Sequence, residues 1–398
     1  MPGGMFMLRL LARLLIRDSQ NTSDPRVREQ YGTLASIVGI VLNLILFAGK
    51  ALIGLATGSI AATADALNNL SDAGSSIITM VGFKVSVKRG DGEHPFGHGR
   101  AEYISGLIVA MIIVAMGFDL GKESIQKIFS PEPVLFTTAT AIVLTASILI
   151  KLYMAYYNRA IGRKIQSVSM RATSLDSMSD AVATGAVLVS GLIGRFFHLN
   201  IDAYAGLIVS LLILYTGYSA ARDTIDPLLG NPPDPEFVHR IEAILSDYPI
   251  VRGYHDLIVH DYGAGRRMIS LHAEVNADGD MMEIHDAIDL IERRLSTELA
   301  CQTVIHMDPI ATDDALINDT KGEILALLRA QIDGGITLHD FRMVPGAVRS
   351  KVLFDAVVPL SVHMSDSELA LRIKNIIAQR RDDLEIAVTI DRPYVRQD

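Results

Sequence analysis

The sequence predicts a multi-pass α-helical membrane domain of six transmembrane helices, followed by a cytoplasmic α+β domain of the ferredoxin-like (metallochaperone-like) type that is duplicated. Three observations predict this organisation. The chain of 398 residues is 49% hydrophobic with a mean hydropathy of +0.31, which is too apolar for an ordinary soluble protein and too polar for a wholly buried one. The apolar stretches end at Asp226-Pro227. Two similar patterns of helices and strands then follow.

Six stretches are long enough to cross a bilayer, which takes about 20 mainly apolar residues. They cover residues 33–57, 59–88, 100–129, 134–159, 172–196 and 201–225. The segment Asn231–Pro235 reads as a linker to the soluble part. We therefore expect an N-terminal segment (1–30), a six-helix domain (31–228), a first soluble domain (234–311) and a second repeat (316–395).

Basic residues gather on one side of the predicted spans. They lie in the N-terminal segment and in the second-to-third and fourth-to-fifth loops: Arg9, Arg13, Arg17, Arg26, Arg28; Lys84, Lys88, Arg89, Arg100; Arg159, Arg163, Lys164 and Arg171. Loops rich in Lys and Arg face the cytoplasm. The sequence therefore predicts a protein of the cell membrane with both termini in the cytoplasm.

The segment Met5–Ile16 is apolar but carries Arg at every fourth position, at Arg9 and Arg13 and then at Arg17. A cleavable signal peptide keeps its apolar core free of Arg. We expect an amphipathic helix that lies on the cytoplasmic face of the bilayer. The alternative is a frayed terminus without a role.

Composition excludes several classes of function. A net charge of −9 gives no indication of nucleic-acid binding. The single cysteine, Cys301, excludes a disulfide framework and a thiolate metal cluster, and we expect it to be a small packed residue. A metalloenzyme motif such as His-Glu-x-x-His is absent from the sequence, so we expect no enzyme and no bound cofactor.

The soluble part reads as helix, strand, strand, helix, strand, twice over. We expect two helices on one face of a small antiparallel sheet in each copy. The tripeptide beginning at His255 (His-Asp-Leu) is echoed at His339 (His-Asp-Phe), and Pro309 is echoed by Pro393 at the same separation. These echoes indicate a duplicated unit.

Two spans carry pairs of oxygen ligands. Asn68 and Asp72 lie four residues apart in the second span, as do Asp176 and Asp180 in the fifth. Residues at i and i+4 share a helix face, about 6 Å apart along the axis. Asp65 lies one turn earlier and could belong to an access path, and simple helix geometry points Asn69 elsewhere.

Charged groups at this depth are costly unless a partner satisfies them. The alternative to a cation is a set of interhelical hydrogen bonds that hold the bundle together. Asn and Ser would suffice for that role, whereas several acids without a matching basic residue in the spans would not. We therefore expect a cation site. Its donors are three carboxylates and one amide, which suit Mn²⁺, Mg²⁺ or Fe²⁺, although affinity alone favours Zn²⁺ over Mn²⁺.

The loop Asp91–Glu102 has the sequence DGEHPFGHGRAE. On the basis of this loop, the six spans and these two pairs of ligands, the chain resembles the cation diffusion facilitator family over roughly residues 30–310. The resemblance implies a homodimer in the lipid bilayer that exports divalent metal in exchange for protons. It assigns the transport site to Asn68, Asp72, Asp176 and Asp180. Zinc transporters of the family usually have His at one of these places, where this chain has Asp176. We therefore expect manganese, with iron, or broad specificity that includes zinc and cobalt, as alternatives.

The resemblance implies two further metal sites. The loop site would use Asp91, His94 and His98, unless these histidines only shape a Gly- and Pro-rich loop. The cytoplasmic dimer site would use five residues, unless they are simple surface side chains: His255, His272, His285, His306 and Asp308. These residue types are good ligands for Zn²⁺ and its neighbours.

Two further expectations come from the resemblance. Arg100 matches a basic position that pairs with an acidic residue after the sixth span, and Asp226 is the candidate partner. The second repeat has Ile390 where the first has His306, so we expect it to be structural or to extend the dimer. As a function of another class, the chain could be a non-transporting membrane sensor or scaffold for metal.

Overall fold

The computed structural model of the chain describes residues 16, 18–22, 24–57, 60–130, 137–197, 201–263, 266–311, 314–346 and 349–392, without the side chains of residues 53–65 and 202. The basic residues of the predicted amphipathic segment, Arg9, Arg13 and Arg17, lie outside the described residues. Two compact units are present. The first contains the chain up to Asn231 together with Asp261–Arg266, and the second contains the remainder from Pro232.

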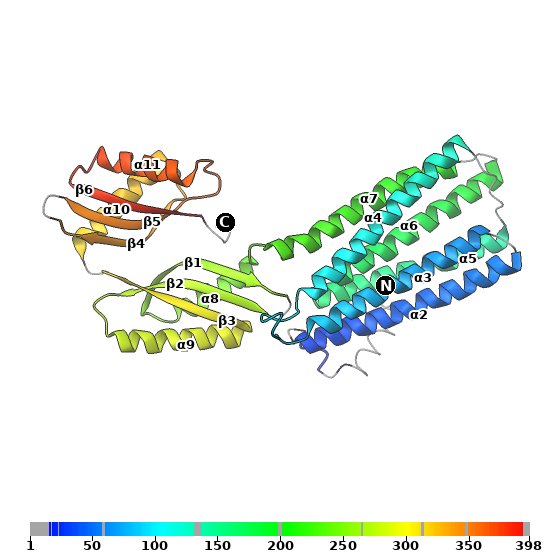
Figure 1. The fold of residues 1–398 in the computed structure, drawn as a ribbon, viewed down its shortest axis with the longest axis horizontal. Helices are drawn as coiled ribbons and strands as arrows, with labels where there is room; N and C mark the ends of the chain where they lie inside the picture. Colours follow the sequence, from blue (N-terminus) through cyan, green and yellow to red (C-terminus); the bar gives the residue numbers. More distant parts are fainter. Residues whose placement is uncertain are drawn as a thin grey trace. The chain divides into compact units, whose positions relative to one another are not determined.

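Long helices form the first unit (Figure 1). They are α2 (Pro25–Thr57), α3 (Ile60–Ser86), α4 (Ala101–Phe129), α5 (Thr138–Lys164), α6 (Val168–Phe197) and α7 (Asp202–Leu229). Among the described residues, five are long and apolar enough to cross a membrane: α2, α4, α5, α6 and α7. The helix α3 is continuous, but polar residues interrupt its apolar sequence, among them Asn68, Asn69 and Asp72. Its place as a sixth span stays a prediction.

Small residues let these helices approach closely. A Cβ added at Gly106 on α4 would lie 3.1 Å from Ser169 Cα on α6 and 2.9 Å from Thr224 Cγ2 on α7. Such small residues are typical of helix crossings in membranes. Ser105 and Ser169 also hydrogen-bond across the same crossing, with 3.1 Å between their Oγ atoms. The crossing brings α6, which carries Asp176 and Asp180, against α4.

The first repeat consists of α8 (Pro235–Ser246), β1 (Val251–Asp261), β2 (Arg267–Asn276), α9 (Met281–Leu299) and β3 (Cys301–Ile310). Asp234 and Asp280 cap the two helices by accepting backbone N–H groups of their first turns. The strand order is β1-β2-β3. A core of buried aliphatic side chains, among them Ile241, Leu271 and Ile291, lies between the helices and the sheet.

The second repeat has the same order of elements: α10 (Ala315–Gln331), β4 (Thr337–Val344), β5 (Ser350–Val357), α11 (Asp366–Ala378) and β6 (Leu384–Asp391). Its strand order is β4-β5-β6, and it has a separate aliphatic core that includes Ile324, Val352 and Ile373. A capping box between Ser365 and Glu368 begins α11.

The prediction of antiparallel sheets is wrong for the last strand of each repeat. β2 pairs with β3 in parallel, and β5 pairs with β6 in parallel, whereas β4 and β5 are antiparallel. The reason is the connection, because a helix (α9 or α11) joins each parallel pair as a crossover. The helices thus cover one face of each sheet and leave the other face to polar side chains.

Both repeats share an irregularity in their first strand. Asp256 and Asp340 adopt positive φ, at 51° and 45°, a region that Asp tolerates better than most residues. In β4 this accompanies a break in register between His339 and Arg342. In β1 both Tyr254 and Leu257 contact the core, so the alternation is broken between them. The break turns His255 toward the face that the helices leave open.

Candidate metal sites

Three carboxylates meet between α3 and α6. Asp72 on α3 and Asp176 and Asp180 on α6 are all buried, and each offers a ligand atom within 4.8 Å of the other two. The Oδ1 atom of Asp176 is buried, and among the described residues it has no hydrogen-bond partner. A buried carboxylate oxygen without a donor is costly, and a divalent cation would satisfy it. The residues therefore fit an oxygen-ligated cation as substrate.

A lysine also lies in this site. Lys151 on α5 places its Nζ 2.6 Å from Asp72 Oδ2 and 2.7 Å from Asp180 Oδ2. The lysine side chain is 4% exposed. Our expectation that the spans contain no matching basic residue is therefore wrong, and Lys50 on α2 is a second buried lysine. Lys151 is an isolated charge within the apolar stretch 134–159, so the hydropathy of the stretch as a whole gives no sign of it.

The amide partner predicted on α3 is placed differently from the acids. Asn68 is exposed, whereas Asn69 is only 2% exposed. Positions three and four residues before Asp72 straddle its helix face, because a turn takes 3.6 residues. Burial alone does not say which way Asn69 points, so the interpretation that it points away from Asp72 stays a prediction. The assignment of Asn68 to the transport site stays a prediction, and the side chain of Asp65 lies outside the described residues.

Hydroxyl groups fix α3 and α6 next to each other near the acids. Thr79 Oγ1 and Thr173 Oγ1 are 3.1 Å apart and both buried. Thr173 lies three residues before Asp176, and Thr79 lies seven residues after Asp72. On the α5 side, Ser174 donates to the backbone carbonyl of Ala155 at 2.8 Å. These bonds hold the three helices that supply the acids and the lysine.

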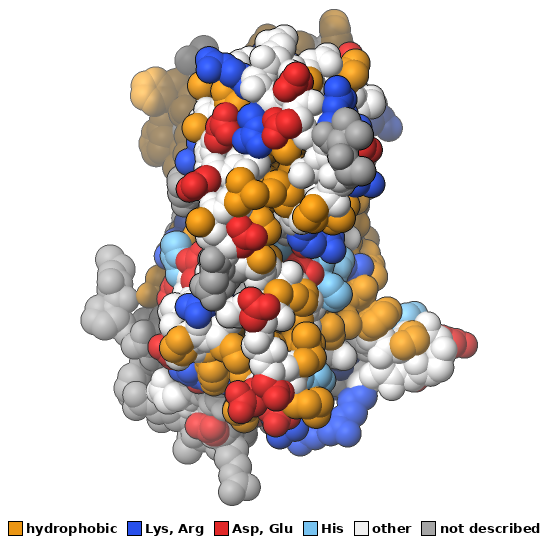
Figure 2. Space-filling model, turned by 90° about the vertical axis from the view of Figure 1, so that its left-hand side faces the viewer, with side chains coloured by type: hydrophobic (Ala, Val, Ile, Leu, Met, Phe, Trp, Pro, Cys, Tyr) orange, Lys and Arg blue, Asp and Glu red, His pale blue; other side chains and the backbone are white. Residues whose placement is uncertain are grey.

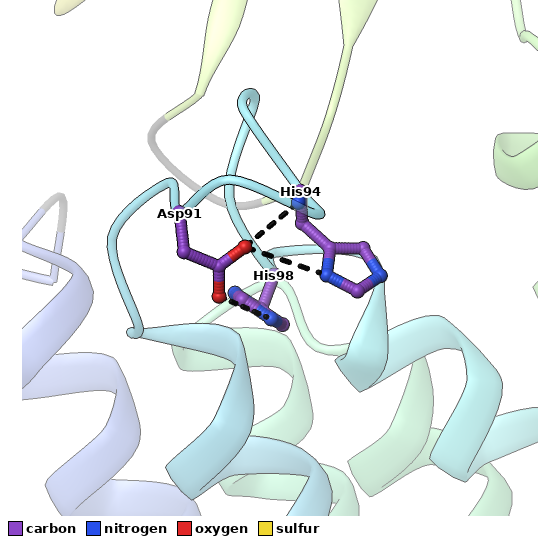
Figure 3. A group of neighbouring side chains, drawn as sticks. All are labelled: Asp91, His94 and His98. Carbon is purple, nitrogen blue, oxygen red and sulfur yellow. Dashed lines mark hydrogen bonds and ion pairs between the residues drawn. The ribbon is translucent and has the colours of Figure 1, made fainter.

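The loop between α3 and α4 brings Asp91, His94 and His98 together (Figure 3). His94 Nδ1 lies 3.6 Å from Asp91 Oδ1, and His98 Nε2 lies 3.5 Å from Asp91 Oδ2. The backbone N–H of His94 donates to Asp91 Oδ1 at 2.7 Å. This bond is the main reason why the pKa of Asp91 lies below its usual value. Two imidazoles and an ionised carboxylate suit Zn²⁺ and similar ions.

The same loop packs on the turn that joins β1 and β2, which belongs to the first unit. Phe96 stacks on Tyr262, with ring centroids 4.8 Å apart. Arg100 donates to the carbonyl of Asp261 at 3.1 Å and lies over the Tyr262 ring. The expected pair between Arg100 and Asp226 is therefore replaced by other contacts.

Asp226 instead pairs with Arg222, one turn earlier on α7. Arg222 Nε lies 3.6 Å from Asp226 Oδ2. The two residues are four apart on an exposed helix surface, where side chains meet readily. We expected Arg100, which is distant in the sequence, to pair with Asp226, but the structure pairs Asp226 with Arg222 on the same helix.

A second cluster lies on the open face of the first repeat. His255, His272 and Asp308 offer ligand atoms within 4.8 Å of one another. His272 and His306 are opposite each other in the parallel pair of β2 and β3, and His306 Nε2 lies 3.2 Å from Asp308 Oδ1. Figure 2 shows histidine side chains beside acidic ones on the surface. Imidazole and carboxylate donors again fit Zn²⁺ and its neighbours.

His285, the fifth predicted member, is exposed on α9. Because α9 covers the other face of the sheet, the single chain does not bring His285 into this group of three. A role for His285 across a dimer stays a prediction.

The charges around His255 affect its protonation. Burial disfavours the imidazolium, but a hydrogen bond to Asp256 and the charges of Asp256, Asp308 and Glu274 outweigh it, so the pKa of His255 is raised above 6.5. His255 Nε2 lies 3.0 Å from Asp308 Oδ2. The cluster thus has ligands that metal and protons compete for.

The second repeat contributes one residue to this region. His339 stacks on His255, with 4.9 Å between ring centroids, and its Nδ1 lies 3.6 Å from Glu274 Oε1. At the positions opposite each other in β5 and β6, Ala356 and Ile390 stand where the first repeat has paired histidines. The second repeat therefore has no equivalent of that His pair on these two strands, but its first-strand histidine adjoins the first repeat's cluster.

Comparisons with known proteins find relatives over most of the chain. A family model described as the cation efflux transmembrane domain matches residues 36–229, and one described as the cation efflux protein cytoplasmic domain matches residues 233–310. An uncharacterized transporter of Methanocaldococcus jannaschii is 31% identical over 273 residues, which cover 68% of this chain and 96% of the relative. The chain belongs to the cation diffusion facilitator family.

Two named relatives of this facilitator are efflux proteins. The manganese efflux system protein MneS of Bacillus subtilis is 29% identical over 283 residues, or 70% of this chain and 96% of the relative. The cation-efflux pump FieF of Cronobacter sakazakii is 29% identical over 291 residues, which cover 71% of this chain and 95% of the relative. The predicted family is confirmed, and the facilitator is a multi-pass membrane protein of divalent cation efflux. Its second repeat lies beyond both family models.

Proposed function

We propose that the protein exports Mn²⁺ from the cytoplasm in exchange for protons. The observation that carries the proposal is the group of three buried carboxylates, Asp72, Asp176 and Asp180, within 4.8 Å of one another. Ionised carboxylates bind a divalent cation and release it when they take up protons, because metal ligands must be deprotonated. Inward proton flow would then drive metal outward.

The choice of manganese rests on the chemistry of the donors. All donors at this site are oxygen atoms, which hard cations prefer, and imidazole is absent from the group of three. A relative named as a manganese efflux protein supports this choice. Fe²⁺, or broad specificity that includes Zn²⁺ and Co²⁺, is the alternative. Geometry and metal availability would set selectivity, since affinity alone favours zinc.

The transport cycle requires the site to open to each side of the membrane in turn. We propose six spans with α3 as the second, both termini in the cytoplasm, and a homodimer. Rocking of the helices around a fixed site near the bilayer midplane would provide alternating access. Metal at the histidine cluster of the soluble part would tighten the dimer and favour one state, provided its affinity differs between states.

Flux measurements test this proposal. Purified protein is placed in vesicles that contain a metal-sensing dye, and Mn²⁺ entry is followed with and without a pH gradient. Asp180→Ala should abolish flux, because it removes a ligand. Asp119→Ala serves as the matched control, since Asp119 is an exposed acid of another long helix, α4. Full activity in Asp180→Ala would contradict the proposal.

The histidine cluster of the first repeat favours a second candidate function, a membrane-anchored metal sensor. In that case the wild-type protein would bind metal at the cluster of His255, His272 and Asp308 and show no flux in vesicles. The buried acids argue against it, because an anchor has no need of them. Competitive uptake of Mn²⁺, Fe²⁺, Zn²⁺ and Co²⁺ in the same vesicles distinguishes the two functions and ranks the metals.

A further inference from the structure

We propose that Lys151 is a built-in cation that occupies the transport site when metal is absent, and that a metal ion must displace its ammonium group to bind. This inference rests on the proposed function of the three acids. It assigns to α5, which supplies no predicted ligand, a part in setting affinity and ion selectivity.

The contacts of the ammonium are those that a metal ion would need. Lys151 Nζ joins Asp72 on α3 to Asp180 on α6 at 2.6 and 2.7 Å. These three side chains are at most 7% exposed. Such charge-assisted bonds are among the stronger hydrogen bonds in proteins. The ammonium therefore bridges the same two helices that the proposed metal site bridges.

Metal and ammonium cannot both hold these two oxygens. A small divalent cation binds carboxylate oxygens at about 2.0–2.2 Å, so an ion between the same two Oδ2 atoms would lie too close to Nζ. Both are positively charged, and their repulsion is strong where water is excluded. Within the described part of the chain, Asp176 Oδ1 has no hydrogen-bond partner. An ion that also binds this third carboxylate therefore gains a contact that the lysine does not make.

A hydroxyl group close to Lys151 on α5 offers an acceptor for the displaced ammonium. Ser147 lies four residues before Lys151 on α5, which places it on the same helix face. Its Oγ is buried, and among the described residues it has no hydrogen-bond partner. Lysine has a flexible four-carbon stem, and long side chains on a helix lean toward its N-terminus. The Ser147 hydroxyl can therefore accept the ammonium after it leaves the acids.

This arrangement predicts selectivity by charge. A monovalent cation would replace one positive charge with another and gain little over the tethered ammonium. A divalent cation brings twice the charge and can engage all three carboxylates. Without metal, the positive charge of the lysine would partly neutralise the three buried carboxylates, which would be costly to keep ionised without a partner.

The test titrates full-length protein in detergent with Mn²⁺. Because the predicted histidine sites would also bind metal, the transport-site component is taken as the part of the titration that Asp176→Asn removes. Lys151→Met, which keeps the length but removes the charge, should bind Mn²⁺ at least tenfold more tightly and lower the KM for flux. Its melting temperature in a metal chelator should fall. Lys151→Arg should bind more weakly, and Lys122→Met, at an exposed lysine of α4, should match wild type.

Opposite changes in metal affinity and metal-free stability separate this role from a structural one, since loss of a purely structural ion pair would lower both. Equal or weaker Mn²⁺ binding by Lys151→Met overturns the inference and leaves the proposed function intact. If Lys151→Met does not fold, Lys151→Arg decides alone, and unchanged or tighter binding by it overturns the inference. If Asp176→Asn removes no part of the titration, both the proposed function and this inference fail.

Discussion

His339 of the second repeat stacks on His255 of the first, with an angle of 25° between the rings. His255 belongs to the cluster with His272 and Asp308, so a residue of the second repeat touches a predicted metal ligand. Removal of a residue that contacts and orients a metal ligand, without binding the metal itself, typically weakens metal affinity 10- to 100-fold.

His339→Ala should therefore weaken Zn²⁺ binding at the cluster by roughly tenfold. The measurement is a Zn²⁺ titration of the full-length protein. His363→Ala is the matched control, because His363 is an exposed histidine of the same repeat. Equal affinities for the two variants would show that the stacking does not influence the cluster.

Metal binding at this cluster should depend on pH in a defined direction. The pKa of His255 is raised above 6.5, with Asp256 the first of the groups that outweigh burial. The imidazolium therefore stabilises the metal-free fold below the ordinary pKa, and this stabilisation is lost as pH rises through the raised pKa. Since metal needs the neutral ring, Zn²⁺ affinity should increase with pH until the raised pKa is passed, by at most about tenfold per pH unit for one proton.

Asp256→Asn tests the cause of that shift. The variant loses the charge that most favours the imidazolium, so the pH at which Zn²⁺ binding levels off should move down. Asp278→Asn, at an exposed acid in the turn after β2, should leave the profile unchanged. A profile for Asp256→Asn that matches wild type would assign the shift to other groups.

A buried ion pair joins the starts of α2 and α4. Arg28 Nη2 lies 3.2 Å from Glu102 Oε2, and the side chains are 11% and 3% exposed. Removing one partner leaves an uncompensated buried charge, which typically costs about 3–5 kcal/mol. Arg28→Ala should lower the melting temperature in detergent markedly, and the double variant Arg28→Met/Glu102→Leu should recover most of it. A melting temperature for Arg28→Ala equal to wild type would show that the pair is solvated.

Close backbone contact restricts the loop that holds Asp91, His94 and His98. A Cβ at Gly99 would lie 2.3 Å from the carbonyl oxygen of Tyr262, which is backbone and cannot turn aside. Gly99→Ala should therefore loosen the loop and lower the melting temperature. Gly92→Ala is the control in the same loop, since its added Cβ would meet nothing within 4 Å. Equal stability of the two variants would contradict the close contact.

How far the sequence predicts this structure depends on whether a feature is local. The last predicted span, 201–225, corresponds to α7 at Asp202–Leu229, because a long apolar run is visible residue by residue. The i, i+4 spacing of Asp176 and Asp180 placed both in one site for the same reason. The parallel pairing of β2 with β3 and the contact of Lys151 with Asp72, which is 79 residues away, depend on how distant segments pack, and no local pattern contains them.

Selectivity can be tested at Asp176, whose Oδ1 has no hydrogen-bond partner among the residues that the structure describes. Asp176→His replaces a hard oxygen donor with an imidazole, which favours Zn²⁺ relative to Mn²⁺. Cells that carry this variant should lose tolerance to manganese and gain tolerance to zinc, and vesicle flux should shift in the same direction. Asp176→Glu keeps an oxygen donor and should reduce flux without changing the order of metals. An unchanged order in Asp176→His would mean that selectivity arises elsewhere, and the ammonium of Lys151, which any incoming ion must displace under our proposal, would be the next determinant to examine.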